Sequence, residues 1–329
     1  MPQNYDKHFK GLATVRLSLA GSLNVPAVQT LMLVGLDPFI ERLRQLGLTQ
    51  IKKPAEYYGY ALALGSTEVS LWELVNAYRT LANLGRYSSL TLTPRHEAPE
   101  SKQAMDEGAA FIVADILADR GARSVSFGLD SPLATPFWSA VKTGTSKDMR
   151  DNWCVGFTPR FTVGVWIGNF GGEPMQNVSG VTGAGPLWLR LVTYLNKLAP
   201  ATAPPAPDTV VTQSVAFEPA VEAARREWFL RGTETAHIQL RPVQDTKPGI
   251  VYPAEGMLIA LDPDIPAGRQ LVPLTASGDR AGLRWRLDGR LLEATQRNWS
   301  PLPGKYSLSL VDQRGGVLDS VRFEVRGSP

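Results

Sequence analysis

The chain has 329 residues, 43% of them hydrophobic and 20% charged, a balance typical of folded globular proteins and not of disordered ones. Its 34 Lys and Arg against 31 Asp and Glu leave a net charge of +3 without a long basic run, so nucleic acid is not an expected partner. The single cysteine, Cys154, excludes an intrachain disulfide. The three histidines lie far apart, so we expect neither a metal nor another cofactor.

The first part of the sequence shows no export or membrane signal. Residues 1–8 are polar, and no apolar stretch of the signal-peptide type follows them. The most apolar window, residues 17–36, is interrupted by Asn24, Pro26 and Gln29. It therefore predicts a poor membrane span.

Residues 12–120 are predicted to be mostly helical. Pro26–Leu36 has the composition of a buried helix, with proline suited to its first turn. Ser70 is a candidate N-cap of the next strong helix, and Glu73 completes a capping box. Gly108–Leu117 is a shorter third helix, predicted from its apolar periodicity.

From residue 136 the hydrophobic period changes to two, which predicts strands. The strands expected are Phe137–Lys142, Asp151–Phe157 and Phe161–Phe170, the last two joined by a tight turn. Pro186–Leu198 returns to a helical pattern. This order predicts an α/β domain with an antiparallel sheet and helices around it.

A proline-rich stretch, residues 198–207, is the clearest boundary in the chain. Residues 208–247 are mixed, and the pattern assigns them no structure. From residue 248 the pattern is all-β, with Asp288-Gly289 as a type I′ hairpin signal, which predicts a small immunoglobulin-like β-sandwich. We therefore expect a first domain over 1–197, a linker and mixed segment over 198–247, and a C-terminal β-domain over 248–329.

Lys142-Thr143-Gly144 is the first candidate for chemistry. An apolar strand pattern precedes it, and Thr145-Ser146 extends its row of hydroxyls. On a strand edge, the triplet presents a cation, hydroxyls and open backbone to a carboxylate ligand. About one chain in ten of this length would contain the triplet by chance, and the alternative is a strand that ends in a Thr-Gly turn.

Ser22-Leu23-Asn24 is the second candidate and the only Ser-x-Asn in the chain. The alternative is that Ser22 caps the helix that begins near Pro26. The two interpretations are compatible, because a short loop that enters a buried helix is a rigid support for polar side chains.

Together these elements resemble the transpeptidase domain of the class A penicillin-binding proteins, which are bifunctional glycosyltransferases and transpeptidases. The similarity extends from residue 12 to 327. Its most specific stretches, quoted from the sequence, are Tyr60–Gly65, Lys142–Trp153, Val155–Pro159 and Val163–Asn169. Val178–Pro186 and the tail with its Trp-x-Leu-Asp-Gly289 resemble the 1C type within this family.

The resemblance implies a penicillin-binding protein/β-lactamase-like α/β fold and acyl transfer at the D-Ala-D-Ala end of a peptidoglycan stem peptide. It gives Ser22 the role of passing a proton to the departing D-alanine, and Asn24 that of holding the nucleophile's lysine and the peptide. Lys142 would stabilise Ser22 and nearby negative charge. Thr143 and Thr145 would bind the terminal carboxylate, the Thr145 N–H would supply an oxyanion donor, and Gly144 would let the peptide approach.

The chain departs from this family in one important respect. The nucleophile motif, Ser-x-x-Lys, is expected on a helix some tens of residues before Ser22, and only 21 residues precede it here. The one Ser-x-x-Lys present, Ser139–Lys142, lies on a predicted strand, where residues three apart face opposite sides. We therefore expect an N-terminally incomplete domain, without its own nucleophile, membrane anchor or glycosyltransferase, that is inactive alone.

Other functions stay open at this point. The domain could be a non-catalytic binding module, with its C-terminal domain docked on wall polymer or a cell-wall protein. A serine β-lactamase or carboxypeptidase is the third alternative. In the complete family member, β-lactams are expected ligands and the periplasmic face of the inner membrane is the expected location. Trp285 and Trp299 are predicted to pack in the sandwich core, the alternative being ligand contact.

Overall fold

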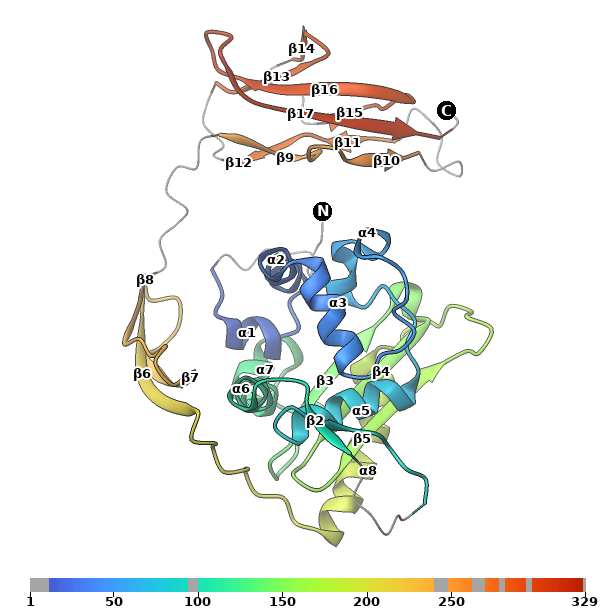
Figure 1. Cartoon of the computed structure of the whole chain (residues 1–329), viewed down its shortest axis with the longest axis vertical. Coiled ribbons are helices and arrows are strands. Elements are labelled where there is room, and N and C mark those ends of the chain that lie inside the picture. The colour runs from blue at the N-terminus through green and yellow to red at the C-terminus, as the bar shows by residue number, and fades with distance from the viewer. Residues whose placement is uncertain are drawn as a thin grey trace. The chain divides into compact units, whose positions relative to one another are not determined.

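A computed structural model of the chain describes residues 12–93, 100–239, 248–261, 270–277, 282–293 and 298–327. The chain forms two compact units, residues 1–240 and 241–329 (Figure 1). Each unit contains a hydrophobic core of its own. Within the described residues, no helix combines the length and the apolar character that a membrane crossing requires.

The first unit contains helices of six to fourteen residues and some shorter turns of helix. They are α1 (Val15–Ala20), α2 (Asn24–Val34), α3 (Leu36–Gln45), α4 (Ala55–Tyr58), η1 (Tyr60–Leu64), α5 (Leu71–Ala82), α6 (Glu107–Ala118), α7 (Arg120–Phe127) and α8 (Gly185–Leu198). The predicted capping box before α5 is confirmed, because Ser70 Oγ accepts the Glu73 N–H and the Glu73 carboxylate accepts the Ser70 N–H. The helix expected over 26–36 instead ends at Gly35, whose φ of 88° starts α3 in a new direction.

An antiparallel sheet lies at the centre of this unit, in the order β3 (Ala140–Thr145), β4 (Asp151–Phe157), β5 (Thr162–Gly168). Its two faces are covered by different helices. A Cβ on Gly164 would meet Val75 of α5, whereas a Cβ on Gly156 would meet Trp188 of α8. These glycines belong to neighbouring rows of the ladder, which point to opposite faces. The α/β architecture predicted from the sequence is confirmed.

The segment that the sequence left unassigned also forms strands. After a short β1–β2 ladder (Arg86–Ser88, Ser101–Gln103) earlier in the unit, β6 (Val210–Glu218) and β7 (Arg225–Leu230) form an antiparallel hairpin. β8 (His237–Gln239) adds to β6 in parallel. Residues 199–207 contain neither helix nor strand, and they carry the chain to this hairpin within the first unit.

The second unit is an all-β sandwich, as predicted. Its strands are β9 (Gly249–Tyr252), β10 (Leu258–Ala260), β11 (Val272–Pro273), β12 (Thr275–Ser277), β13 (Arg284–Leu287), β14 (Arg290–Leu291), β15 (Asn298–Trp299), β16 (Gly304–Val311) and β17 (Val317–Arg326). A five-stranded sheet in the order β10-β17-β16-β13-β14 lies against the β9–β12 and β11–β15 pairs (Figure 1). Asp288 and Gly289 both have positive φ, as the type I′ turn requires.

Both tryptophans of this unit belong to its core. Trp285 is 9% exposed and lies among the buried residues. The Trp299 ring packs edge-on against Tyr306, with ring centroids 4.5 Å apart, and also against Phe323. The prediction of core packing is therefore confirmed.

Candidate active site

The structure brings Lys142 of β3 into contact with Ser22, which lies 120 positions earlier in the chain. The Lys142 ammonium donates to Ser22 Oγ at 2.5 Å and to the carbonyl of Thr143 at 2.7 Å. Two of the three residues predicted to be catalytic therefore share a hydrogen bond. Because the two elements are so far apart in sequence, only the tertiary fold creates this pair.

Ser22 occupies a strained backbone position at the end of α1. Its N–H donates to the carbonyl of Leu19, and the N–H of Leu23 donates to that of Ser18. This is the Schellman pattern, in which the residue after the C-cap is left-handed and is usually glycine. Here the C-cap is Gly21, and the residue after it is Ser22. Ser22 adopts that conformation with φ of 57°, so the hydroxyl is aimed at Lys142 by a turn that would favour glycine.

Asn24 is the first residue of α2, two positions after Ser22, and is partly buried. The N-cap of α2 is Leu23, and no side chain of the described residues caps this helix. The alternative in which Ser22 caps the following helix is therefore wrong, because Ser22 terminates the preceding helix instead. Ser22 and Asn24 thus stand on either side of the junction between two helices.

Lys142 is a partly buried cation for which no carboxylate forms an ion pair within the described residues. Burial lowers its pKa to about 8, because the charged form loses its hydration. The nearby Cys154 gives little compensation, since burial raises the pKa of that thiol to about 12 and keeps it neutral. An uncompensated ammonium beside a hydroxyl favours the binding of an anion.

The predicted carboxylate-binding row follows Lys142 along β3, an edge strand among the described strands. Thr143 is partly buried and Thr145 is exposed. Thr145 Oγ1 accepts the Gly180 N–H at 2.9 Å, so its own hydrogen is available to a ligand. The row therefore keeps a hydroxyl donor at the open end of the strand.

Two glycines beside this row differ in the space that their neighbours leave for a side chain. A Cβ on Gly144 would lie 3.7 Å from Trp153, its nearest neighbour across the sheet and an ordinary contact. A Cβ on Gly180 would lie 2.6 Å from the carbonyl oxygens of Gly144 and Trp153. Packing therefore requires Gly180, which the sequence analysis missed, whereas the described neighbours of Gly144 leave room for a side chain. A serine and threonine capping box around Gly180 was the available signal.

Ser139 and Lys142, the one Ser-x-x-Lys of the sequence, do not act as a pair. Ser139 is 3% exposed, and its hydroxyl is bonded to Thr135 Oγ1 at 2.8 Å. Lys142 points to Ser22 instead. Ser139 precedes β3, which begins at Ala140, so the expectation that both residues lie on the strand is wrong, although they do face different surroundings.

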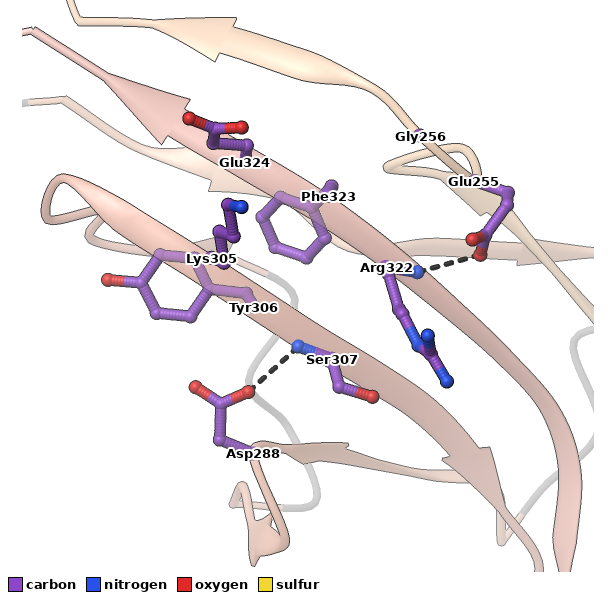
Figure 2. Close-up of a pocket in the computed structure, with 9 residues that line it drawn as sticks. All are labelled: Glu255, Gly256, Asp288, Lys305, Tyr306, Ser307, Arg322, Phe323 and Glu324. Atoms are coloured by element: carbon purple, nitrogen blue, oxygen red, sulfur yellow. Dashed lines mark hydrogen bonds between the residues drawn. The ribbon is translucent and has the colours of Figure 1, made fainter.

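Two open hollows lie elsewhere. One, of about 400 Å³, lies in the second unit around Asp288, Ser307 and Arg322 (Figure 2). Two of its acidic residues stabilise the fold, because Asp288 accepts the Ser307 N–H and Glu255 accepts the Arg322 N–H. The other, of about 450 Å³, is lined by Asp148, Met149 and residues 174–177 of the first unit. No cluster of three or more metal-ligating side chains is present in the described part of the chain.

Two family profiles match the chain. The penicillin binding protein transpeptidase domain matches residues 2–172, and the Penicillin-Binding Protein C-terminus Family matches residues 237–323. The chain belongs to the class A penicillin-binding proteins. The transpeptidase match covers Ser22, at the turn between α1 and α2, and Lys142 on β3.

Among curated relatives, Penicillin-binding protein 1C of Escherichia coli K12 is 31% identical over 263 residues, 77% of this chain and 33% of that protein. Penicillin-binding protein 1A of Aquifex aeolicus VF5 is 30% identical over 215 residues, 61% of this chain and 28% of that protein. The chain thus spans about a third of these relatives. The crystal structure of penicillin-binding protein 1A from Haemophilus influenzae supports the same fold, with a TM-score of 0.60 at 18% identity over 71% of this chain and 42% of that one.

The left-handed turn predicts different effects for two substitutions of one serine. We expect Ser22→Gly to be more stable to unfolding than Ser22→Ala by about 1 kcal/mol, because only glycine adopts a positive φ without strain. Both variants lose the Lys142 contact equally, so their difference reports the turn alone. Urea unfolding followed by circular dichroism measures it. Equal stabilities, or a more stable alanine variant, would contradict the strain.

Proposed function

We propose that this chain supplies the substrate-binding and proton-transfer residues of a D,D-transpeptidase, which cross-links peptidoglycan stem peptides by acyl transfer at D-Ala-D-Ala. The observation that carries the proposal is the contact between Ser22 and Lys142, a cation without an ion-pair partner in the described part of the chain, at the start of a hydroxyl row. The family supports it, because the profile that covers these residues is that of a penicillin-binding transpeptidase.

In this proposal the terminal carboxylate of the peptide lies along β3. Thr143 and Thr145 donate hydrogen bonds to it, and the open face of Gly144 admits the peptide backbone. Lys142 stabilises the negative charge and keeps Ser22 Oγ in place. When the acyl–nitrogen bond breaks, Ser22 passes a proton to the D-alanine amine that leaves, and Asn24 binds the peptide and the nucleophile's lysine.

The attacking serine would come from outside these 329 residues. The family places its Ser-x-x-Lys before Ser-x-Asn. In the one such motif here, Ser139 and Lys142 make hydrogen bonds to other residues and not to each other. The complete protein would then also carry the glycosyltransferase, bind β-lactams and work at the periplasmic face of the inner membrane. This chain alone would bind the peptide without forming an acyl-enzyme.

A non-catalytic binding module is the second candidate. The intact carboxylate-binding row without an attacking group in the same sequence favours it. Both candidates require the chain to bind a D-Ala-D-Ala terminus. They differ in whether the complete protein converts the bound peptide into a cross-linked product.

Peptide binding is expected to be sensitive to a side chain at Gly144. We expect the chain to bind a peptide that ends in D-Ala-D-Ala, and Gly144→Ala to weaken this binding at least about tenfold, because the new methyl group occupies the space proposed for the ligand. Stability should stay equal or rise slightly, since glycine is unfavourable inside a strand. Isothermal titration calorimetry and thermal melting measure the two effects.

Two controls make this test specific. Gly180→Ala should lower the melting temperature, because its Cβ meets two backbone carbonyls. The same peptide with a C-terminal amide should bind the unmodified chain poorly, since it lacks the carboxylate that Thr143 and Thr145 are proposed to bind. Equal affinity for acid and amide peptides would overturn the proposed role of the row.

Peptide binding is also expected to depend on pH. The pKa of Lys142 is near 8, so the ammonium is charged at pH 7 and loses its charge as the pH rises through 8. We expect peptide affinity to be constant from about pH 6 to 7 and to fall above pH 8, by at most about tenfold per pH unit. Lys142→Met should bind more weakly at pH 7 and should lose the dependence. A wild-type affinity that stays flat to about pH 10, together with an equal affinity of Lys142→Met at pH 7, would show that the charge of Lys142 does not contribute to peptide binding.

Labelling with a penicillin separates binding from chemistry. We expect a fluorescent penicillin to leave no covalent label on the purified chain after denaturing electrophoresis, whereas a complete class A relative treated in parallel is labelled. A stable adduct on this chain, mapped to any hydroxyl by mass spectrometry, would show that it carries its own nucleophile.

A further inference from the structure

Arg16, on α1, is the buried centre of a partly exposed ion cluster that links α1 to α6, α7 and β7. Its side chain is 7% exposed. It donates to Asp115 of α6 at 2.6 Å and to Asp119, the N-cap of α7, at 3.2 Å. It also makes a paired contact with the carboxylate of Glu227 on β7. Burial alone would lower the Arg16 pKa, but the hydrogen bonds to Glu227 and Asp115 outweigh it and raise the pKa.

The β6–β7 hairpin that supplies Glu227 is docked closely on α6. Trp228 packs edge-on against Phe111, with ring centroids 5.1 Å apart. A Cβ on Gly108 would come within 3.0 Å of Val210 and Leu230, so α6 is glycine where the hairpin lies against it. The hairpin is thus a packed element of the unit and gives Glu227 a fixed position.

A second arginine of the hairpin extends the link to the beginning of α1. Arg225 shares the Glu227 carboxylate at 2.9 Å and donates to Thr14 Oγ1 at 3.3 Å. Thr14 is the N-cap of α1 and accepts the N–H of Leu17. The hairpin therefore contacts α1 at its cap and, through Arg16, along its side.

These contacts matter because α1 ends at the reacting pair. The helix has six residues, which is too short to be stable without tertiary contacts. Its C-terminal turn holds Ser22 in the left-handed conformation, six residues after Arg16. Lys142 approaches from β3, an independent element. The 2.5 Å contact between Lys142 and Ser22 therefore depends on where α1 is held.

We propose that Arg16 is a positioning residue for the Ser22–Lys142 pair, and that the β6–β7 hairpin acts on the site through it. The inference rests on the proposed function in that Ser22 and Lys142 are taken as a reacting pair. Arg16 acts at a distance from the ligand and from Lys142. It fixes α1, and α1 places the Ser22 hydroxyl against the ammonium.

The test uses a thiol in place of the Ser22 hydroxyl in the full chain. Cys154 is buried, and its pKa of about 12 keeps it unreactive, so Ser22→Cys adds one reactive thiol and the unmodified chain serves as the blank. A thiol held against the Lys142 ammonium should have a pKa below the ordinary value of about 8.5. The pH dependence of its alkylation by iodoacetamide measures that pKa. Lys142→Met should abolish the lowering.

Adding Arg16→Met or Glu227→Gln to Ser22→Cys should return the pKa of the introduced thiol toward about 8.5 and slow its alkylation at about pH 6.5 by about tenfold or more. Arg226→Met is the matched control, because this exposed neighbour on β7 donates to Thr212 of the same hairpin and should change nothing. An introduced thiol whose pKa stays low in both folded variants, as judged by circular dichroism, would overturn the proposal.

Two further measurements keep the result decisive. If a variant does not fold, amide hydrogen exchange in the unmodified chain tests the proposal instead. The N–H groups of Ser22 and Leu23 should then exchange at the same rate-limiting opening as those of β7. Independent exchange would overturn the proposal. Peptide binding is measured separately: a chain that binds no D-Ala-D-Ala peptide but shows the Arg16-dependent thiol pKa loses the proposed function and keeps the positioning role of Arg16.

Discussion

The hydrogen bond between Lys142 and Ser22 is the interaction on which the site depends. It joins a strand of the central sheet to the turn between two helices, and neither element would place its polar group usefully alone. The sheet is held by packing on both faces, with α5 on one side and α8 on the other. The turn is held by a Schellman hydrogen-bond pattern that tolerates a serine at some cost in strain. The contact thus joins a cation on a packed strand to a hydroxyl on a turn of defined backbone conformation.

Two poorly exposed cations of this unit, Arg16 and Lys142, lie in opposite electrostatic surroundings. Arg16 is surrounded by three carboxylates, and its pKa is raised. Lys142 has no carboxylate partner among the described residues, and its pKa falls to about 8. Removal of a cation from water is costly unless an anion compensates for it. Arg16 therefore has the surroundings of a structural residue, whereas Lys142 retains the unmet charge that a ligand would satisfy.

Local patterns were sufficient for much of the fold. The capping box of Ser70 and Glu73, the bounds of β4 and the Asp288-Gly289 turn each depend on neighbouring residues, and each was predicted correctly. The Lys-Thr-Gly triplet and Ser-x-Asn were recognised as motifs, but the sequence could not show that Lys142 and Ser22 touch. The left-handed state of Ser22 was also not visible, because glycine is the usual residue there and Gly21 lies one position too early.

The β6–β7 hairpin shows why the remainder could not be predicted. Its strongest link is between Glu227 and Arg16, 211 positions apart, and neither residue belongs to a recognisable motif. The proline-rich stretch before it looked like a domain boundary, since such composition usually separates domains. In the structure that stretch leads to an element that packs back on α6 and reaches α1. The hairpin after the proline-rich stretch, to which the sequence pattern assigned no structure, therefore contacts the helix that leads to Ser22.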